Sequence, residues 1–282
     1  MNALTIDVED WHHDGDGLRP SGAAYEDARV ERNLHRLLDL LDATRTRATL
    51  FVLGEVAERF PDLVRDAFRR GHEIASHGYR HRPVGAWLRR EFRDDVARSR
   101  ALLQDLTGAP VRGYRAPYFS IKAGVHWPGD VLAELEVGYD SSVLPIDRPP
   151  GLELVSPRGP YRLASGVWEV PIAVNRFGFW NLPLCGGFAL RVLPVGFVER
   201  RLAEFNRDVG PAVVHLHPWE LDAGGPEPAS VPAAVRRLKR LGRSSLPRKL
   251  ERLLAAHSFD SIATVFGDVF GGPRSAPHSP SA

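Results

Sequence analysis

Two histidines four residues apart, His77 and His81, have a type and spacing that suggest a specific chemistry. They follow a short apolar run, and on the first turn of a helix both side chains would project from one face, about 5–6 Å apart. Two imidazoles held in this way suit a divalent transition metal, with a carboxylate or water completing the coordination shell. The same pattern also fits a loop whose histidines are solvated or buried without a ligand. The missing ligands must therefore be sought elsewhere in the chain.

Three other β-prone runs also end in polar side chains. Residues 3–6 lead directly into Asp7, Glu9 and Asp10. Burying such carboxylates is costly unless they meet a metal ion or a proton, although the same residues could form a turn and capping cluster. The two later runs end in the segments Arg115-Ala116-Pro117-Tyr118 and His215-Leu216-His217-Pro218-Trp219-Glu220. Four runs therefore deliver candidate site residues.

The β-prone runs alternate with segments of helical periodicity. Apolar residues recur at spacings of three and four in residues 26–42 and in the longer segment 84–107. The run before His77 is residues 72–76, and the other predicted strands are residues 48–53, 137–142, 168–172 and 259–265. The other predicted helices are residues 55–60, 61–70, 131–135, 196–207 and 247–256. Residues 176–194 are predicted to form a long loop or hairpin.

Alternating strands and helices predict an α/β fold with a mainly parallel sheet. The polar groups all follow strands, and the C-terminal ends of strands share one face of a barrel, so we expect a barrel or a barrel-like arrangement. The chain has 282 residues, of which 43% are hydrophobic, enough for one large domain that we place at residues 1–270. Residues 271–282 are rich in Pro and Ser, and their composition predicts a disordered tail.

Charge and hydropathy argue against several partners and compartments. The 37 Lys and Arg residues nearly balance the 35 Asp and Glu residues, so the charge does not indicate binding of nucleic acid. The basic segment 236–240 is interpreted as the solvated face of a helix. No run approaches 18 apolar residues, so no membrane span is predicted. The N-terminus lacks the features of a secretory signal, and the single cysteine, Cys185, is interpreted as a small buried thiol. Cytoplasmic residence is therefore expected.

Taken in order, the four segments resemble the motifs of the polysaccharide deacetylase family (the NodB-homology deacetylases, carbohydrate esterase family 4). An acidic motif comes first, S-H-x-x-x-H follows at Ser76–His81, R-x-P-Y follows at Arg115–Tyr118, and a late strand ends in a histidine. The resemblance extends from Leu4 to about Val269. It implies a NodB-type distorted (β/α) barrel, with helices outside mainly parallel strands.

Details of the motifs are most similar to one branch of that family. The usual start is T-F-D-D-G, whereas this chain has D-V-E-D-W at Asp7–Trp11. That form, together with H-P-W-E at His217–Glu220 and the stretch 183–194, resembles the deacetylases found with exosortase-type exopolysaccharide loci. This branch is similar to a subgroup that also includes peptidoglycan deacetylase-like and allantoinase-like members.

The resemblance also implies catalytic roles. Asp7 matches the general base, and Arg115 matches the arginine that pairs with the base and keeps it ionised. His217 matches the general acid, although His215 is an alternative that the sequence leaves open. The backbone N–H of Tyr118 matches the donor to the tetrahedral oxyanion.

The metal ligands that the resemblance implies are His77 and His81, completed by an acid. Two adjacent aspartates are usual, but they are not adjacent here. Alternation along a strand favours Glu9, which shares a face with Asp7, whereas an earlier end of the strand would make Asp10 available. We expect one divalent ion, zinc in the first place, with cobalt or nickel as alternatives.

Aromatic and proline residues near the motifs complete the predicted site. Trp11, Tyr118 and Trp219 are candidates for a sugar-stacking rim, and Pro117 lies beside the oxyanion donor in the motif. The leading hypothesis is a metal-dependent hydrolase that removes N-acetyl groups from amino sugars of a polysaccharide or its lipid-linked precursor, in exopolysaccharide biosynthesis or modification. The alternatives are a hydrolase of a small amide, similar to allantoinase-like relatives, and a non-catalytic carbohydrate-binding relative.

Overall fold

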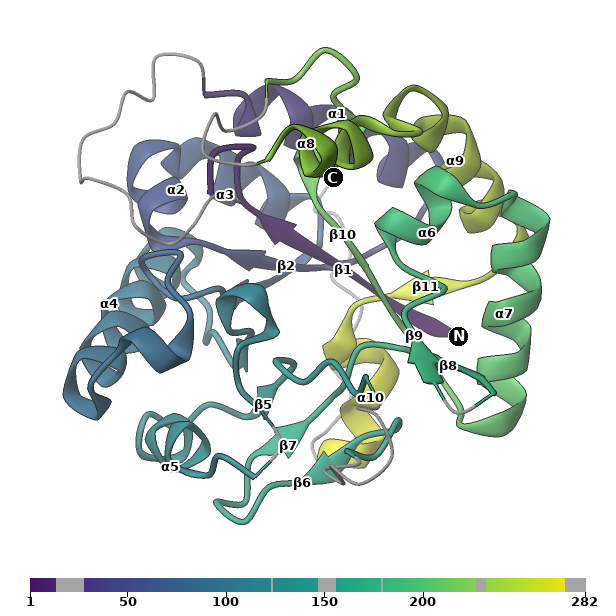
Figure 1. Ribbon diagram of the computed structural model, residues 1–282. Helices are drawn as coiled ribbons and strands as arrows, with labels where there is room; N and C mark the ends of the chain where they lie inside the picture. Colours follow the sequence, from purple (N-terminus) through teal and green to yellow (C-terminus); the bar gives the residue numbers. More distant parts are fainter. Residues whose placement is uncertain (14–27, 123, 147–155, 179, 227–231, 272–282) are drawn as a thin grey trace.

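A curled, mainly parallel sheet with helices around it organises the molecule (Figure 1). The computed structural model describes residues 1–13, 28–122, 124–146, 156–178, 180–226 and 232–271. Within these ranges the main sheet has nine strands in the order β10-β1-β2-β3-β4-β5-β7-β6, with β11 paired to β1. These pairings are parallel except that of β6 with β7. The distorted (β/α) barrel that the sequence predicts is confirmed.

The strands are short apart from the first. They are β1 (Asn2–Val8), β2 (Thr49–Val52), β3 (Glu73–Ser76), β4 (Gly113–Tyr114), β5 (Tyr139–Asp140), β6 (Tyr161–Arg162), β7 (Trp168–Glu169), β10 (Val213–Leu216) and β11 (Phe259–Asp260). Two further strands, β8 (Asn175–Phe177) and β9 (Trp180–Leu182), form a separate antiparallel hairpin.

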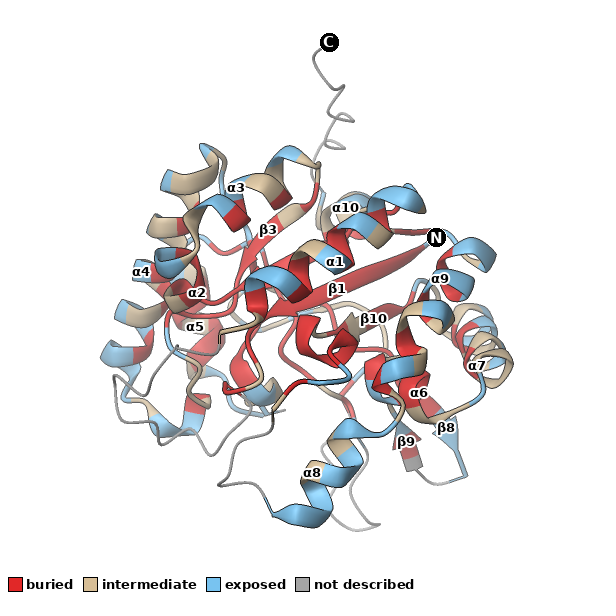
Figure 2. Ribbon diagram, turned by 90° about the horizontal axis from the view of Figure 1, so that it is seen from above, coloured by how far each residue is buried: buried red, intermediate tan, exposed pale blue. Residues whose placement is uncertain are grey.

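The helices lie outside the sheet (Figure 2). They are α1 (Val30–Ala43), α2 (Gly54–Arg59), α3 (Pro61–Arg69), α4 (Arg89–Thr107), α5 (Trp127–Glu134), α6 (Gly187–Val192), α7 (Val195–Asp208), α8 (Ala233–Arg240), α9 (Leu246–Ala256) and α10 (Ile262–Phe270). All of them except α8 have a buried side. The spacing of apolar residues explains this arrangement in α1, where Leu34, Leu37, Leu38 and Leu41 are all buried.

Strand β1 is the centre of the sheet, and all seven of its residues are buried. Its residues 3–6 pair with β10 and its residues 5–8 pair with β2. A strand buried on both faces requires a nearly continuous apolar run, which residues 3–6 provide almost completely. The acidic residues that follow therefore emerge where the C-terminal ends of β2, β3 and β10 also lie.

The barrel is completed by extended chain after β7. The N–H of Ile172 donates to the carbonyl of Val143, and the N–H of Ala173 donates to the carbonyl of Val213 in β10. The segment after β7 thus reaches the other edge strand of the sheet. Helix α10 packs against the sheet at β5, where Phe270 stacks on Tyr139 with ring centroids 5.3 Å apart.

The structure resolves one open alternative and differs from the sequence-based expectation in two further places. Residues 77–83 are not the first turn of a helix but an irregular loop, in which Gly78 has φ +76°. Residues 262–265 belong to α10 rather than to a strand, because Ser261 caps that helix by accepting a hydrogen bond from the N–H of Thr264. The stretch predicted as loop or hairpin contains the hairpin β8–β9 but also helix α6. The predicted tail lies outside the described residues beyond Gly271.

Candidate active site

A buried ion pair forms the base of the site. Arg115 follows β4, and its Nη1 lies 2.7 Å from Oδ1 of Asp7 at the end of β1. The same guanidinium donates to Oγ1 of Thr5 at 2.9 Å and to the carbonyl and hydroxyl of Ser141 at 3.0 and 2.9 Å. It also lies 4.0 Å from the ring centroid of Phe51. Arg115 is therefore fixed on several sides and holds one carboxylate oxygen of Asp7.

The second oxygen of Asp7 faces two histidines. Oδ2 lies 3.9 Å from Nε2 of His77 and 3.8 Å from Nδ1 of His215. Burial alone would raise the pKa of Asp7, but the charge of Arg115, with smaller contributions from the histidines, lowers it to about 2. Asp7 is therefore ionised at neutral pH, with Oδ2 directed into the site.

The backbone of Arg115 orients His77. Nδ1 of His77 lies 2.8 Å from the carbonyl oxygen of Arg115. A carbonyl can only accept, so Nδ1 carries the proton and Nε2 presents a lone pair. Burial lowers the pKa of His77 to about 4, against the attraction of Asp7. A neutral imidazole with its other nitrogen bonded to a carbonyl is the usual state of a metal-ligating histidine.

His81 reaches the same place from the loop after β3. Its Nε2 lies 2.7 Å from Oε2 of Glu9. The loop is held by Asp95 of α4, whose carboxylate accepts from the N–H groups of Tyr79 and Arg80 at 2.7 and 3.0 Å. These two bonds replace the helical turn that the spacing of the histidines suggested.

Glu9 and Asp10 have different surroundings. Donor atoms of Glu9, His77 and His81 all lie within 4.8 Å of one another. Asp10 is turned toward α1 instead, where its carboxylate accepts from the N–H groups of Arg29 at 2.6 Å and Val30 at 3.0 Å. A carboxylate at a helix N-terminus satisfies N–H groups that have no partner within the helix. Glu9 therefore lies beside the two histidines, and Asp10 caps the helix.

The group Glu9, His77 and His81 fits a divalent transition metal in its donor chemistry. It offers two imidazole nitrogens and one carboxylate, the set of a site that keeps open positions for water or substrate. The tautomer of His77 leaves Nε2 available, as a ligand requires. A second group of possible ligands, Asp7, His215 and His217, lies at the end of β10. Asp7 in this group is already held by Arg115, so the group containing Glu9 fits better.

His217 lies between two carboxylates. Its Nε2 is 3.3 Å from Oε1 of Glu9 and its Nδ1 is 3.3 Å from Oε2 of Glu220. Burial alone would lower the pKa of His217, but these carboxylates together raise it to about 9. Burial lowers the pKa of His215 to about 3 despite its proximity to Asp7. At neutral pH, His217 is therefore the protonated histidine of the two.

Glu220 is itself fixed by a further ion pair. Its Oε1 lies 2.9 Å from Nε of Arg191 in α6, and its Oε2 accepts from the N–H of His217 at 2.9 Å. Gly187 of α6 approaches so closely that a Cβ at this position would collide with the Glu220 carboxylate. The sequence alone assigned no role to Glu220. Its position in H-P-W-E, three residues after His217, is the signal that could have found it.

The segment Pro117–Phe119 forms a strained 3₁₀ turn beside His81. Tyr118 has φ 59°, a left-handed conformation that is costly for a residue other than glycine. Its ring centroid lies 4.4 Å from that of His81, and its hydroxyl donates to the carbonyl of His13 at 2.9 Å. Pro117 is buried, whereas Tyr118 is 38% exposed. The turn therefore brings the backbone of Tyr118 and its ring to the site.

A buried polar network behind this turn was missed by sequence reasoning. The hydroxyl of Ser142 accepts from the N–H of Ala116 at 2.7 Å and also bonds to Asp140. Asp140 and Glu169 are paired neighbours in β5 and β7. Burial raises the pKa of Asp140 to about 6 and that of Glu169 well above its usual range, so the two carboxyls hold a proton between them. The D-S-S sequence at the exit of the predicted strand was the available signal.

The two predicted tryptophans occupy different positions. Trp219 is 6% exposed, stacks on His217 with centroids 4.9 Å apart, and places its Nε1 3.3 Å from Oε1 of Glu9. Trp219 therefore packs against one face of the His217 ring and shields it from solvent. Trp11 is half-buried and meets the ring of His12 edge to face at 5.5 Å. Trp219 therefore contacts the group that contains Glu9, and Trp11 contacts the ring of His12.

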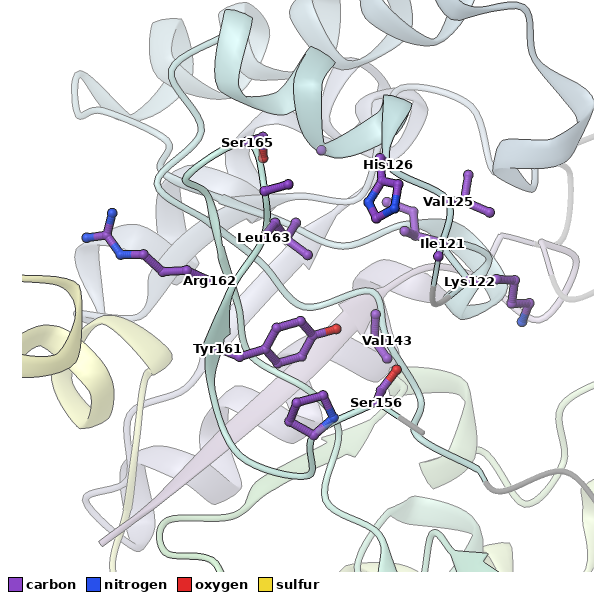
Figure 3. A pocket seen from close by; sticks show the side chains of 14 residues that line it. Ile121, Lys122, Val125, His126, Val143, Ser156, Tyr161, Arg162, Leu163 and Ser165 are labelled. Atoms are coloured by element: carbon purple, nitrogen blue, oxygen red, sulfur yellow. The ribbon is translucent and has the colours of Figure 1, made fainter. Parts of the chain in front are cut away.

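A cavity of about 540 Å³ lies next to the strained turn (Figure 3). Ile121, two residues beyond the turn, and Val143, one residue beyond Ser142, contribute to its wall. The rings of His126 and Tyr161 border it from opposite sides (Figure 3). Its volume lies within the range of pockets that bind small molecules.

Two family descriptions match this chain. Residues 21–135 match the family described as polysaccharide deacetylase, and residues 141–267 match a domain of unknown function, DUF3473. The first match contains the two histidines and the R-x-P-Y segment, and the second contains strand β10 and His217, which directly follows it. The site is thus assembled from both regions and from β1, which precedes them.

Curated relatives and solved structures give consistent comparisons. A chitooligosaccharide deacetylase of Bradyrhizobium sp. (strain ANU 289) is 35% identical over 135 residues, covering 42% of this chain and 62% of the relative. A peptidoglycan-N-acetylglucosamine deacetylase of Bacillus cereus is 34% identical over 86 residues, covering 30% and 31%. The chain thus spans less than two thirds of these relatives. A crystal structure from Mycobacterium smegmatis, assigned as a polysaccharide deacetylase, has a TM-score of 0.64 at 23% identity and covers 98% of this chain and 93% of that one, a likeness of fold.

Proposed function

The chain contains a polysaccharide deacetylase domain, and from this premise we propose that it removes N-acetyl groups from amino sugars of a polysaccharide or its lipid-linked precursor. One observation carries the proposal: a fixed carboxylate, a histidine–carboxylate donor group and a histidine held between two carboxylates converge at the C-terminal ends of β1, β3 and β10. Hydrolysis of an amide needs all three kinds of group.

Glu9, His77 and His81 are the residues that would hold a divalent metal ion. Such an ion polarises the acetyl carbonyl and makes water nucleophilic near neutral pH. We infer zinc, with cobalt or nickel as alternatives, because a set of two histidines and one carboxylate accepts each of them. The tautomer of His77 and the short approach of His81 to Glu9 support this assignment.

The remaining residues move protons and stabilise charge. Oδ2 of Asp7 accepts the proton of the attacking water, while Arg115 holds the other oxygen. His217 gives its proton to the departing amine, a role that its raised pKa supports over His215. The N–H of Tyr118 donates to the developing oxyanion, and the left-handed turn sets the direction of that N–H.

The cavity beside the turn supports an extended substrate rather than a small amide. We infer that it receives a neighbouring sugar of the same chain, against the ring of Tyr161. Tyr161→Ala should then raise KM for long oligosaccharides while leaving turnover of the shortest substrate unchanged. An equal change in KM for oligosaccharides of every length would show that the cavity does not bind the substrate.

Three broader features also belong to this proposal. Residues 1–270 act as a single catalytic domain, because the site draws on strands from both the N-terminal and the C-terminal parts of the chain, β1 and β10, which are neighbours in the sheet. The substrate is an exopolysaccharide or its precursor, as the resemblance of the D-V-E-D-W and H-P-W-E segments to the exopolysaccharide-locus branch suggests. The protein acts in the cytoplasm. No helix within the described ranges is long and apolar enough to cross a membrane.

Acetate release tests the proposal. Purified protein supplied with the metal should release acetate from N-acetylated oligosaccharides, and Asp7→Asn should retain the metal and lose turnover. Release of ammonia or amine from small amides without action on the saccharides would indicate the small-amide hydrolase instead. Binding of the saccharide without release of acetate would indicate a non-catalytic carbohydrate-binding protein.

A further inference from the structure

Helix α8 is amphipathic, yet it does not bury its apolar side. Its sequence, AAVRRLKR, contains four basic residues and no acidic residue. No residue of the helix is buried, and it projects from the body of the protein as an exposed element (Figure 2). A surface helix normally turns its apolar stripe toward the core. The stripe of α8 therefore requires another explanation.

The apolar and basic residues occupy separate sides of α8. At 100° per residue, Val235 and Leu238 share one stripe with Leu241, which directly follows the helix. Their side chains are 42%, 47% and 54% exposed. The opposite side carries Arg236, Arg237, Lys239 and Arg240. Both the apolar stripe and the cationic side of α8 are thus exposed.

The C-terminal end of α8 is tied to the candidate active site. Arg191 of α6 donates to the carbonyl of Lys239 and, at 3.1 Å, to that of Leu241. The same guanidinium bonds to Glu220, which accepts from the N–H of His217. A further exposed apolar side chain, Phe188, lies at this junction, with Cζ of Arg191 5.5 Å from its ring centroid. The exposed helix therefore stands next to the catalytic face.

We propose that α8 is an interfacial helix that docks this face of the protein onto a membrane containing anionic lipids. Such a surface accepts both halves of the helix, because the apolar stripe enters the acyl boundary and the cations meet lipid headgroups. Nucleic acid would use the cations but gain little from Val235, Leu238 and Leu241. A second copy of α8 would bring like charges together.

This inference also narrows the substrate. If the proposed deacetylase function holds, the docked face favours a saccharide carried at a membrane surface, as in a lipid-linked precursor. Docking itself needs no catalysis, so the two proposals fail separately. Asp7→Asn should bind vesicles as well as the unaltered protein does.

Vesicle binding tests the docking. The full chain should sediment with vesicles that contain phosphatidylglycerol and much less with pure phosphatidylcholine, and added salt should weaken binding. Each cation near an anionic surface contributes about fivefold in partition, so Arg236→Gln with Arg237→Gln should weaken binding about 25-fold. Leu238→Ser should weaken it as well, because the apolar stripe is shortened.

Matched changes elsewhere give the controls. Arg90→Gln with Arg93→Gln removes two exposed cations from α4, and Val125→Ser removes an exposed apolar side chain, so neither should alter vesicle binding. All α8 variants should keep their activity on soluble oligosaccharides. Absence of vesicle binding, or equal losses in the α4 and α8 variants, would overturn the proposal. So would self-association that Leu238→Ser abolishes, because a second copy would then occupy the stripe.

Discussion

The carbonyl oxygen of Arg115 accepts a hydrogen bond from Nδ1 of His77 at 2.8 Å, while the side chain of the same arginine holds Asp7 at 2.7 Å. One residue therefore orients a proposed metal ligand through its backbone and the proposed base through its guanidinium. These two functions can be separated by mutation, because a change of side chain leaves the carbonyl in place.

Arg115→Gln should separate them. It removes one partner of a buried ion pair, which should lower the free energy of unfolding by about 3–5 kcal/mol. The loss of a fixed position for Asp7 should lower kcat at least about 100-fold. Metal content, measured on folded protein, should stay near that of the unaltered chain. Loss of the metal together with activity would show that the two functions are not separable.

Ser142→Ala should affect the oxyanion turn. The N–H of Ala116 loses its buried acceptor, at a cost of about 1–3 kcal/mol in stability, and the strained turn at Tyr118 loses a support. We expect kcat to fall about tenfold or more with little change in KM, and Ser142→Thr to restore most of it because the hydroxyl remains.

Ser261→Ala is the matched control for this change. It removes the N-cap of α10 at a cost of about 1 kcal/mol but lies outside the site, so kcat should not change. If both serine variants lowered kcat alike, the effect of Ser142 would be one of stability and not of position.

The stability of the protein should fall on mild acidification, in part through His72. Nδ1 of His72 accepts from the N–H of Ala48 at 3.3 Å, and burial lowers the pKa of His72 from 6.5 to about 4. The unfolded chain therefore binds this proton first, so stability is complete above pH 6.5 and is lost as the pH falls toward 4. His72→Gln should reduce the slope of unfolding free energy against pH in this window by up to about 1.4 kcal/mol per unit. Urea unfolding at several pH values measures it, and an unchanged slope would contradict the account.

The architecture followed from local patterns in the sequence. The apolar run 3–6 predicted the central strand, and the polar groups after successive strands predicted a barrel. Both patterns could be recognised because each is formed by residues that are close together in the sequence. The turn between His77 and His81 could not be predicted in the same way. Its conformation depends on hydrogen bonds to the carboxylate of Asp95, which lies in α4. Nothing in the sequence around the two histidines indicates these bonds.

The site shows the same division between local and distant causes. Alternation along β1 favoured Glu9 over Asp10, and the structure places Glu9 beside the histidines. The reason that Asp10 turns away lies in α1, whose first N–H groups it caps across a gap of about twenty residues. Likewise, Ser142 supports the turn at Ala116 from another strand. Such contacts arise only when the sheet has formed.

Metal analysis of two acid variants tests the central claim most directly. Glu9→Gln and Asp10→Asn each remove one negative charge, and the two residues are neighbours in sequence. The account predicts about one divalent ion per chain in the unaltered protein and in Asp10→Asn, and a loss of metal affinity and of acetate release in Glu9→Gln. Retention of the ion by Glu9→Gln with its loss from Asp10→Asn would contradict the proposed metal site.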